Sequence, residues 1–207
     1  MTKIPFVGLH AHSGLSLNDG LGYPQDHMDF AYENGADALA LTDHGHMNGL
    51  PYQVLHARKM KAEGKNFKPI FGVEAYFNPS LEQWRIEYEK AKQEKKKGIK
   101  NDIELSIENE KASKQKVVDI LKKRNHLILI AQNQTGLNNI FKLVSESYKD
   151  ENFYRYPRMD YDLLSRHSDG VIAASACLGG VYAGNYWDNK DDGDEAVLEA
   201  MRDTTRR

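Results

Sequence analysis

Cysteine is almost absent from this sequence, since Cys177 is the only one in 207 residues. An internal disulfide is therefore excluded, and a reducing compartment is favoured. Long hydrophobic runs are missing as well. No apolar stretch approaches the roughly 20 residues that cross a bilayer, and the first residues lack the apolar core of a signal peptide. We therefore expect a cytoplasmic protein that does not bind a membrane.

The sequence also lacks a strong net charge, with a formal value of −2 at pH 7. Overall charge therefore gives no reason to expect nucleic-acid binding. The charges are unevenly placed, because residues 80–125 carry more lysine and arginine than aspartate and glutamate, while the remainder is acidic. A solvated helical excursion is the favoured interpretation of this segment, and a basic arm that contacts DNA phosphates is the alternative.

The sequence does contain enough apolar material for a core. Hydrophobic residues make up 40% of the chain, and short apolar runs alternate with stretches of helical periodicity. The expected strands are Phe6–His12, Asp37–Asp43, Pro69–Phe77, His126–Gln132 and Val171–Cys177. The expected helices are Pro24–Asn34, Gln53–Glu63, Thr135–Tyr148 and Asp192–Arg207. Most of these strands are apolar on both faces, which favours parallel βαβ units in an open doubly wound sheet or a β/α barrel.

Two histidines close the first expected strand, in the stretch FVGLHAHSGLSLNDG. Because residues two apart in a strand point to the same side, His10 and His12 are expected to project together. Paired imidazoles chelate transition metals, although an isolated His-x-His is more often a packing or surface feature. Asp19 follows in the same stretch and adds a carboxylate.

Other strands deliver ligand-type side chains near one of their ends. The second runs into Asp43 and His44, the third carries Glu74, the fourth opens on His126 and the fifth ends at Cys177. Parallel strands gather their carboxyl ends on one side of the sheet, where α/β folds place their chemistry. His126 fits less well because it lies at the start of its strand, and a lone cysteine in an apolar strand is more often an inert core thiol. The remaining histidines are interpreted as ordinary helix, loop or surface residues: His27, His46, His56 and His167.

The order of these motifs resembles a known family. HAHS with the aspartate of LNDG, then TDHG, GVEAYF, HLILIAQN and SACLGG are similar to the successive motifs of the polymerase-and-histidinol-phosphatase (PHP) domain. GLNNIFKLVSESY and FYRYPRMDYDLLSRHSDGVI resemble the version at the N-terminus of the bacterial or phage-type DNA polymerase III alpha subunit, rather than the small histidinol phosphatases. The likeness runs from residue 6 to about residue 187.

The resemblance implies a fold and a metal site. The family forms a distorted (β/α)7 barrel that holds up to three divalent transition metals, and mixed nitrogen, oxygen and sulfur ligands suit Zn, Mn or Fe better than Mg or Ca. The implied metal ligands are His10, His12, Asp19, His44, Glu74, His126 and Cys177. The implied catalytic set is His10, His12, Asp19, Asp43, His44 and Glu74, with Asp43 orienting His44 or its neighbours.

The function implied by the resemblance is metal-dependent phosphoester hydrolysis, as a proofreading-type 3′–5′ exonuclease on DNA ends. Two alternatives stay open. One is a catalytically silent scaffold that stabilises a polymerase and binds a separate proofreading subunit, and the other is a stand-alone phosphoesterase like histidinol phosphatase. The implied partners are DNA, the rest of a polymerase chain, a proofreading exonuclease subunit and the sliding clamp, in a bacterial or phage-infected cell.

The resemblance is incomplete toward the C-terminus. The family's last motif, an Asp-x-His, is missing, His167 is the final histidine, and the five expected strands are fewer than the barrel needs. We therefore expect residues 1–207 to be the N-terminal portion of a PHP domain that lacks its C-terminal strands, with a charged helical insertion at about 80–125 and no polymerase domains. The third metal should be poorly held and DNA hydrolysis weak.

Overall fold

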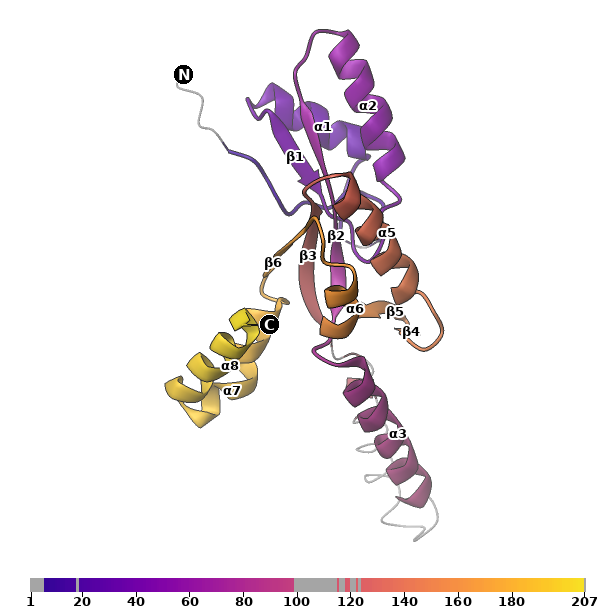
Figure 1. Cartoon of the computed structure of the whole chain (residues 1–207), viewed down its shortest axis with the longest axis vertical. Coiled ribbons are helices and arrows are strands. Elements are labelled where there is room, and N and C mark those ends of the chain that lie inside the picture. The colour runs from indigo at the N-terminus through magenta and orange to yellow at the C-terminus, as the bar shows by residue number, and fades with distance from the viewer. Residues whose placement is uncertain are drawn as a thin grey trace.

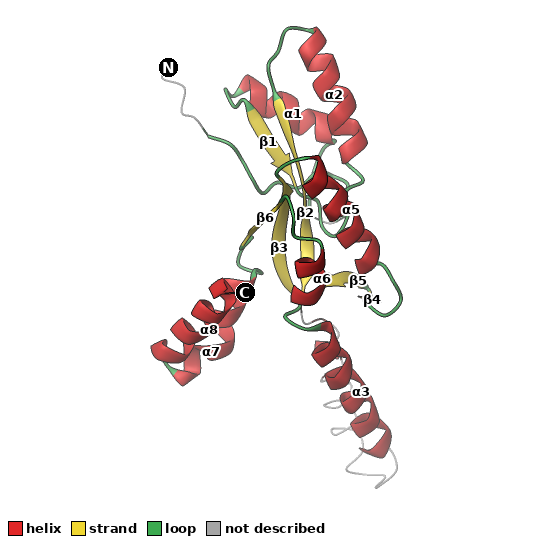
Figure 2. Ribbon diagram, viewed as in Figure 1, coloured by secondary structure: helices red, strands yellow, loops and turns green. Residues whose placement is uncertain are grey.

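A computed structural model describes residues 6–17, 19–98, 115, 118–119, 122 and 124–206. Its helices surround a central sheet (Figures 1 and 2), so the expected α/β class is confirmed. The strands are β1 (Ala38–Leu41), β2 (Lys68–Phe77), β3 (Asn125–Ala131), β4 (Phe153–Tyr154), β5 (Tyr156–Met159) and β6 (Val171–Ala174). The helices are α1 (Pro24–Glu33), α2 (Leu50–Ala62), α3 (Leu81–Gly98), α5 (Gln134–Ser147), α6 (Tyr161–Arg166), α7 (Val181–Asn189), α8 (Asp194–Arg206) and the short 3₁₀ helix η1 (Lys190–Asp192).

Strand β2 is the spine of the sheet. The strand order is β4-β5-β2-β3-β6, and β1 pairs with β2 outside this path. Residues 68–71 of β2 pair with β1 in parallel, whereas residues 72–77 pair with β3 in the antiparallel sense. Figure 2 shows β1 beside one part of β2 and β3 beside the other. The second part of β2 carries Glu74, which pairs with Ile128 of β3 on one side and forms an isolated bridge with His44 on the other.

The prediction of parallel βαβ units is wrong for three of the five strand pairings, including that of β4 with β5. Strands β1 and β5 run parallel to β2, but β3 is antiparallel to β2 and β6 is antiparallel to β3. The last residue of β2, Phe77, lies opposite the first residue of β3, Asn125. The chain therefore re-enters the sheet at the end where it left. Apolar residues on both faces of a strand indicate that both faces are covered, and they carry no information about its direction.

The described strands form an open path. Its two ends are β4 and β6, and no pairing between them closes it among the residues that the structure describes. The expectation that the chain is the N-terminal portion of a barrel stays a prediction. Helices α7 and α8 pair with each other beyond β6 and lie away from the rest of the sheet (Figure 1).

The predicted strand Phe6–His12 does not form. The segment is extended and follows β1 through one isolated bridge between Gly8 and Leu39, with two further backbone hydrogen bonds to Ala40 and Thr42. Its outward side chains stay exposed, as the 49% exposure of Leu9 shows. These few contacts hold the segment beside β1, but they do not form the continuous ladder of hydrogen bonds that defines a strand.

Four short elements were not predicted from the sequence. Strands β4 and β5 and helices α6 and α7 are short, at 2, 4, 6 and 9 residues. Strand β5 has Pro157 and Arg158 at buried positions, so it lacks the apolar alternation by which strands are recognised. Arg158 is nevertheless fully buried, because it donates hydrogen bonds to the carbonyls of Tyr154 and Tyr156.

The main core lies between the sheet and α5, whose helical periodicity was predicted correctly. Val73 and Leu129 from the strands meet Ile140 and Leu143 from α5, and all four side chains are completely buried. A Leu or Ile at such a position contributes about 1.5–3 kcal/mol of burial free energy. This packing holds β2 and β3 rigidly beneath the site described below. No helix in the described part of the chain is long and apolar enough to span a bilayer.

The segment predicted as a charged excursion lies partly outside the described residues. Its first part is α3, which extends away from the sheet (Figure 1). Leu81, Trp84 and Ala91 of α3 are nonetheless buried, and the Arg158 guanidinium lies 4.6 Å from the Trp84 ring centroid. The first turns of α3 are therefore packed against the fold. The existence of a dispensable insertion stays a prediction, and its boundary belongs after Ala91.

Candidate metal centre

Glu74 lies at the centre of the ligand-type side chains that the sequence singles out. Its side chain is fully buried, although it belongs to a strand surrounded by apolar residues. On one side of Glu74 is β3, and on the other the segment after β1, whose Asp43 carbonyl accepts from the Glu74 N–H at 3.1 Å. The Glu74 carbonyl in turn accepts from the Gly45 N–H at 2.8 Å. These contacts bring the expected second and third ligand motifs side by side.

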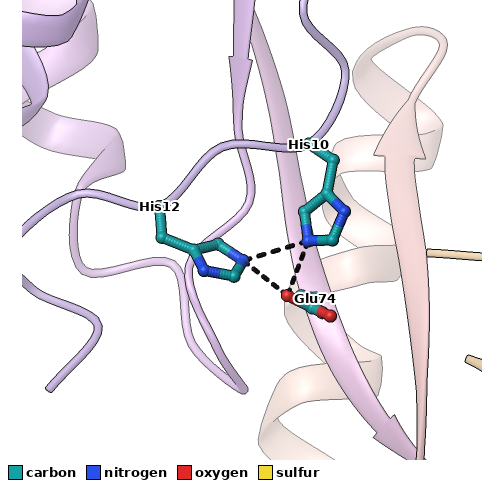
Figure 3. Close-up of side chains that lie close together, drawn as sticks. All are labelled: His10, His12 and Glu74. Carbon is teal, nitrogen blue, oxygen red and sulfur yellow. Dashed lines mark hydrogen bonds and ion pairs between the residues drawn. The ribbon is translucent and has the colours of Figure 1, made fainter. Parts of the chain in front are cut away.

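His10 and His12 converge on Glu74, as predicted from their spacing. Figure 3 shows both rings pointing at its carboxylate. The Nε2 atoms of the two histidines lie 3.1 Å apart, and Glu74 Oε2 lies 2.8 Å from His10 Nε2 and 2.5 Å from His12 Nε2. Three lone-pair-bearing atoms thus meet within one small volume. The rings converge because the extended segment lies along β1, next to β2.

Asp19 and His44 extend the cluster on the other side of His12. Asp19 Oδ2 contacts His12 Nδ1 and lies 2.9 Å from His44 Nε2. The rings of His12 and His44 are tilted against each other with centroids 4.3 Å apart. The Asp19 side chain is the most open of the set, with 48% of its surface exposed. The cluster is therefore open to solvent on the side of Asp19.

His126 completes the cluster from β3, and the antiparallel pairing explains its place. Its Nδ1 lies 2.7 Å from Glu74 Oε1. Because β3 runs opposite to β2, the start of β3 meets the end of β2, so a histidine at the start of β3 reaches the same site as Glu74 in the second half of β2. Cys177 follows β6 and lies at the edge, with Sγ 3.6 Å from His126 Nδ1 and 3.9 Å from Glu74 Oε1.

Hydrogen bonding in the cluster shifts the acid–base behaviour of its members. Burial alone would raise the pKa of Glu74, but hydrogen bonds from His12, His126 and His10 outweigh it and hold the pKa far below its ordinary value of 4.5. Burial would lower the pKa of His12, yet its bonds to Glu74 and Asp19 raise it above 6.5. For His44 burial prevails and the pKa falls. Neutral imidazole is the form that binds metals.

The donor atoms form three overlapping groups that could each hold a metal ion. Within each group the ligand atoms lie within 4.8 Å of one another, and the groups are His10–His12–Glu74, His12–Asp19–His44 and His44–Glu74–His126. Every two groups share one residue. His44 Nδ1 is buried without a hydrogen-bond partner among the described residues, although Glu74 Oε2 is 3.3 Å away. A buried nitrogen lone pair beside a carboxylate is costly unless a cation lies between them. The residues present therefore fit divalent transition metals.

Asp43 lies outside these groups and has different partners. Its Oδ1 accepts from the Ser13 N–H at 2.7 Å and from Ser16 Oγ at 2.9 Å, and its Oδ2 accepts from Ser13 Oγ at 2.9 Å. Ser16 Oγ also accepts from the His44 N–H at 3.0 Å. Hydrogen bonds through Ser16 thus link the Asp43 carboxylate to the backbone N–H of the neighbouring His44. Its arrangement agrees with an orienting role, which stays a prediction.

Sequence reasoning missed the aromatic side chains next to the ligands. The Tyr76 ring is stacked on His44, with centroids 5.6 Å apart and an interplanar angle of 5°, and it meets His126 edge-on. Tyr156 lies against Tyr76 with centroids 4.9 Å apart. Since residues two apart share a face of a strand, the position of Tyr76 after Glu74 was a usable signal. Tyr156 comes from the unexpected strand β5, and no sequence pattern pointed to it.

Histidines that were interpreted as ordinary residues do lie elsewhere. His56 on α2 pairs with Asp29 on α1 at 2.8 Å, and His27 lies 2.6 Å from the Leu21 carbonyl oxygen. His46 contacts the Leu15 carbonyl oxygen at 3.2 Å. None of these belongs to a candidate metal group in the part of the chain that the structure describes.

Comparison with known proteins identifies relatives over nearly the whole chain. The model of the PHP domain family matches residues 8–206. A DNA polymerase III subunit alpha of Aquifex aeolicus is 38% identical over 176 residues, which is 85% of this chain and 12% of the relative. The subunit of Treponema pallidum is 35% identical over 181 residues, covering 87% of this chain and 12% of the relative. The subunit of Chlamydia trachomatis is 34% identical over 198 residues, which is 96% of this chain and 13% of the relative. The chain thus spans only about an eighth of the length of these relatives.

Proposed function

The chain belongs to the PHP domain family, and we propose that it is a metal-dependent phosphoesterase module of a replicative DNA polymerase, acting on DNA 3′ ends as a proofreading-type exonuclease. One observation carries the proposal. Six ligand-type residues from four separate parts of the chain converge into overlapping groups around the buried carboxylate of Glu74. A structural ion-pair network would not need four histidines whose nitrogen atoms all lie near one buried carboxylate.

The ligand residues divide the chemistry between them. Divalent transition ions held here would supply the Lewis acidity and the activated water that phosphoester hydrolysis needs. Glu74 is ionised at neutral pH and contributes a fixed negative charge that belongs to two of the three groups. His12 and His44 each belong to two groups as well, so their rings fix the separation of neighbouring sites. Asp19, the most exposed ligand, contacts both rings and orients them from the solvent side.

The relatives supply the substrate class and the partners of the proposal. Because the matching proteins are DNA polymerase III alpha subunits, DNA and the rest of a polymerase chain are the expected partners. A proofreading subunit and a sliding clamp remain predictions from the resemblance. Zn, Mn and Fe are the metals that the donor set favours. Hydrolysis by this chain alone should be slow, because the family's Asp-x-His motif is not in the sequence.

The test combines metal analysis with two substrates. The full chain is loaded separately with Zn, Mn and Fe, its metal content is measured, and hydrolysis is followed on 5′-labelled single-stranded DNA with a free or a blocked 3′ end and on histidinol phosphate. We expect bound metal and slow, chelator-sensitive shortening of the free-ended DNA only. The matched variants are Glu74→Gln, which should abolish shortening, and His56→Asn, which should not affect it.

Each other result assigns a different function. Folded protein that binds no metal under any loading would contradict the proposal and favour the silent scaffold. Metal binding with turnover of histidinol phosphate but not of DNA would favour the stand-alone phosphatase. Shortening that persists in Glu74→Gln would indicate a contaminating nuclease and would remove the support for this site.

A further inference from the structure

Arg124 lies at the border of the candidate metal centre. It precedes β3 and is two residues from His126. Its guanidinium carbon is 3.9 Å from the ring centroid of Tyr156 and 5.2 Å from that of Tyr76. The Tyr76 ring in turn contacts the ligand rings of His44 and His126. One aromatic ring therefore separates the cation from the metal ligands.

Within the described part of the chain, Arg124 has no carboxylate partner for its charge. Its Nη1 donates to the Lys122 carbonyl at 3.0 Å, and no carboxylate pairs with it among the residues that the structure describes. Its Nε–H is buried without an acceptor in the same part of the chain. A half-buried cation that lacks a counter-charge is unfavourable unless a ligand supplies one. The other cations stacked on aromatic rings near this end of the sheet differ, as Arg158 is anchored by two carbonyls.

The two tyrosine rings give the guanidinium a defined orientation. Arginine stacks on aromatic faces and presents a rigid fork of N–H groups that matches two oxygens of a phosphate. Stacking on Tyr156 also limits the number of side-chain rotamers, so less entropy is lost when an anion binds. Because Tyr76 stands between the guanidinium and the ligand rings, the fork is offset from the phosphate that the metal ligands would surround.

We propose that Arg124 is a positioning residue that binds a second phosphate of the substrate, next to the one that is cleaved. The inference rests on the proposed function and deepens it. It makes the site selective for phosphodiester chains over phosphate monoesters, because only a chain presents a second phosphate at this offset. Arg124 touches neither the metal ligands nor the cleaved bond.

The variant Arg124→Gln tests the proposal in the full chain. Fluorescence anisotropy of a labelled single-stranded oligonucleotide should show about 10-fold weaker binding, and the salt dependence of binding should decrease by about one released ion. The KM for oligonucleotide hydrolysis should rise by a similar factor with little change in kcat. Hydrolysis of p-nitrophenyl phosphate should be unchanged. Arg124→Lys, which keeps the charge but not the fork, should bind the oligonucleotide with intermediate affinity.

The control is Arg155→Gln, which removes the same charge from an exposed arginine near β5. Arg155 lies over Tyr154 at 5.9 Å and not over the rings that contact the ligands. This variant should bind DNA and metal as the unmodified chain does. Equal losses of DNA affinity in both variants would show that Arg124 contributes only to the general surface charge. That result would overturn the inference.

Further outcomes separate this inference from the proposed function. Arg124→Gln that loses metal content and thermal stability along with DNA binding would show that the residue only holds Tyr76 in place. Unchanged affinity and KM in Arg124→Gln, in a chain that shortens DNA, would overturn the inference alone. If the unmodified chain neither binds nor shortens DNA, both proposals fail.

Discussion

Two buried carboxylates on neighbouring segments, Glu74 and Asp43, have opposite surroundings. Glu74 is 0% exposed and Asp43 is 3% exposed. Glu74 is surrounded by imidazoles, from which it has contacts at 2.5–3.3 Å. Asp43 is surrounded by serine hydroxyls and a backbone N–H, with contacts at 2.7–3.1 Å. Burial is therefore equal, and the chemistry of the neighbours differs.

The difference separates a binding group from a supporting group. Hydroxyls and N–H groups donate hydrogens to Asp43 and satisfy it completely, so it has nothing left to offer a ligand. Neutral imidazoles and the Glu74 carboxylate compete for the same few protons, and an unpartnered His44 nitrogen remains. Of the two clusters, only that of Glu74 has a donor set that could hold a cation. The Asp43 cluster instead fixes the loop that follows His12.

Removing the charge of Glu74 should have the largest effect. In Glu74→Gln the amide keeps the shape but cannot neutralise a cation, and its NH₂ faces histidine nitrogens. We expect affinity for Zn or Mn to fall by more than about 100-fold, since even residues that only contact metal ligands change affinity 10–100-fold. Isothermal titration of the chelator-treated protein measures this. Near-normal affinity would mean that Glu74 is a structural carboxylate like Asp43.

Weakening the Asp43 cluster should have a smaller and different effect. Asp43→Asn replaces an acceptor oxygen by an NH₂ that faces the Ser13 hydroxyl, which should lower the free energy of unfolding by about 1–3 kcal/mol. Metal affinity should fall only about 10-fold, through the loosened loop. Thermal unfolding with and without metal separates the two effects. A loss of metal binding as deep as that of Glu74→Gln would make Asp43 a direct ligand.

The pH dependence of stability should also distinguish the clusters in metal-free protein. The lowered pKa of Glu74 stabilises the fold above its ordinary pKa of 4.5, and this contribution is lost as pH falls below it. The raised pKa of His12 stabilises the fold below 6.5, and that contribution is lost as pH rises through the raised value.

The Tm difference between the unmodified chain and Glu74→Gln should therefore be greatest between these limits and decline on both sides. For Asp43→Asn no alkaline decline is expected, because serine hydroxyls do not titrate there. Differential scanning calorimetry from pH 3.5 to 9 would measure both curves, with a chelator present throughout. A flat profile for Glu74→Gln would contradict the imidazole–carboxylate pairing.

Shortening the charged segment should have the smallest effect on either cluster. In the sequence, residues 93–122 follow the buried part of α3, which ends near Ala91. A Gly/Ser linker of about twelve residues is long enough to return from Ala91 to the sheet. A helix advances only about 1.5 Å per residue, whereas an extended chain covers about 3.3 Å per residue. Metal content should be unchanged and unfolding free energy should change by less than about 1 kcal/mol. A deletion that also removes Trp84 should destabilise the fold, which provides the comparison.

The sequence predicted the helices and the identities of the clustered ligand residues well. Helices α1, α5 and α8 begin and end within two residues of their expected bounds, because their apolar faces repeat at helical spacing. His10 and His12 converge as their spacing required. Strand direction could not be predicted, since it depends on where the chain re-enters the sheet. The short strands β4 and β5 have too few residues to show the apolar alternation by which strands are predicted.

By itself, the sequence determined which chemical groups are available and in which order. Imidazoles, carboxylates and one thiol are the available ligand groups, and this combination favours transition metals over Mg or Ca. Only the tertiary structure decided how they meet. The antiparallel return of β3 brings His126 to Glu74, and β5 adds Tyr156 beside Arg124. The physical reason is that pairing between strands distant in the sequence sets these distances, and local spacing encodes no such information.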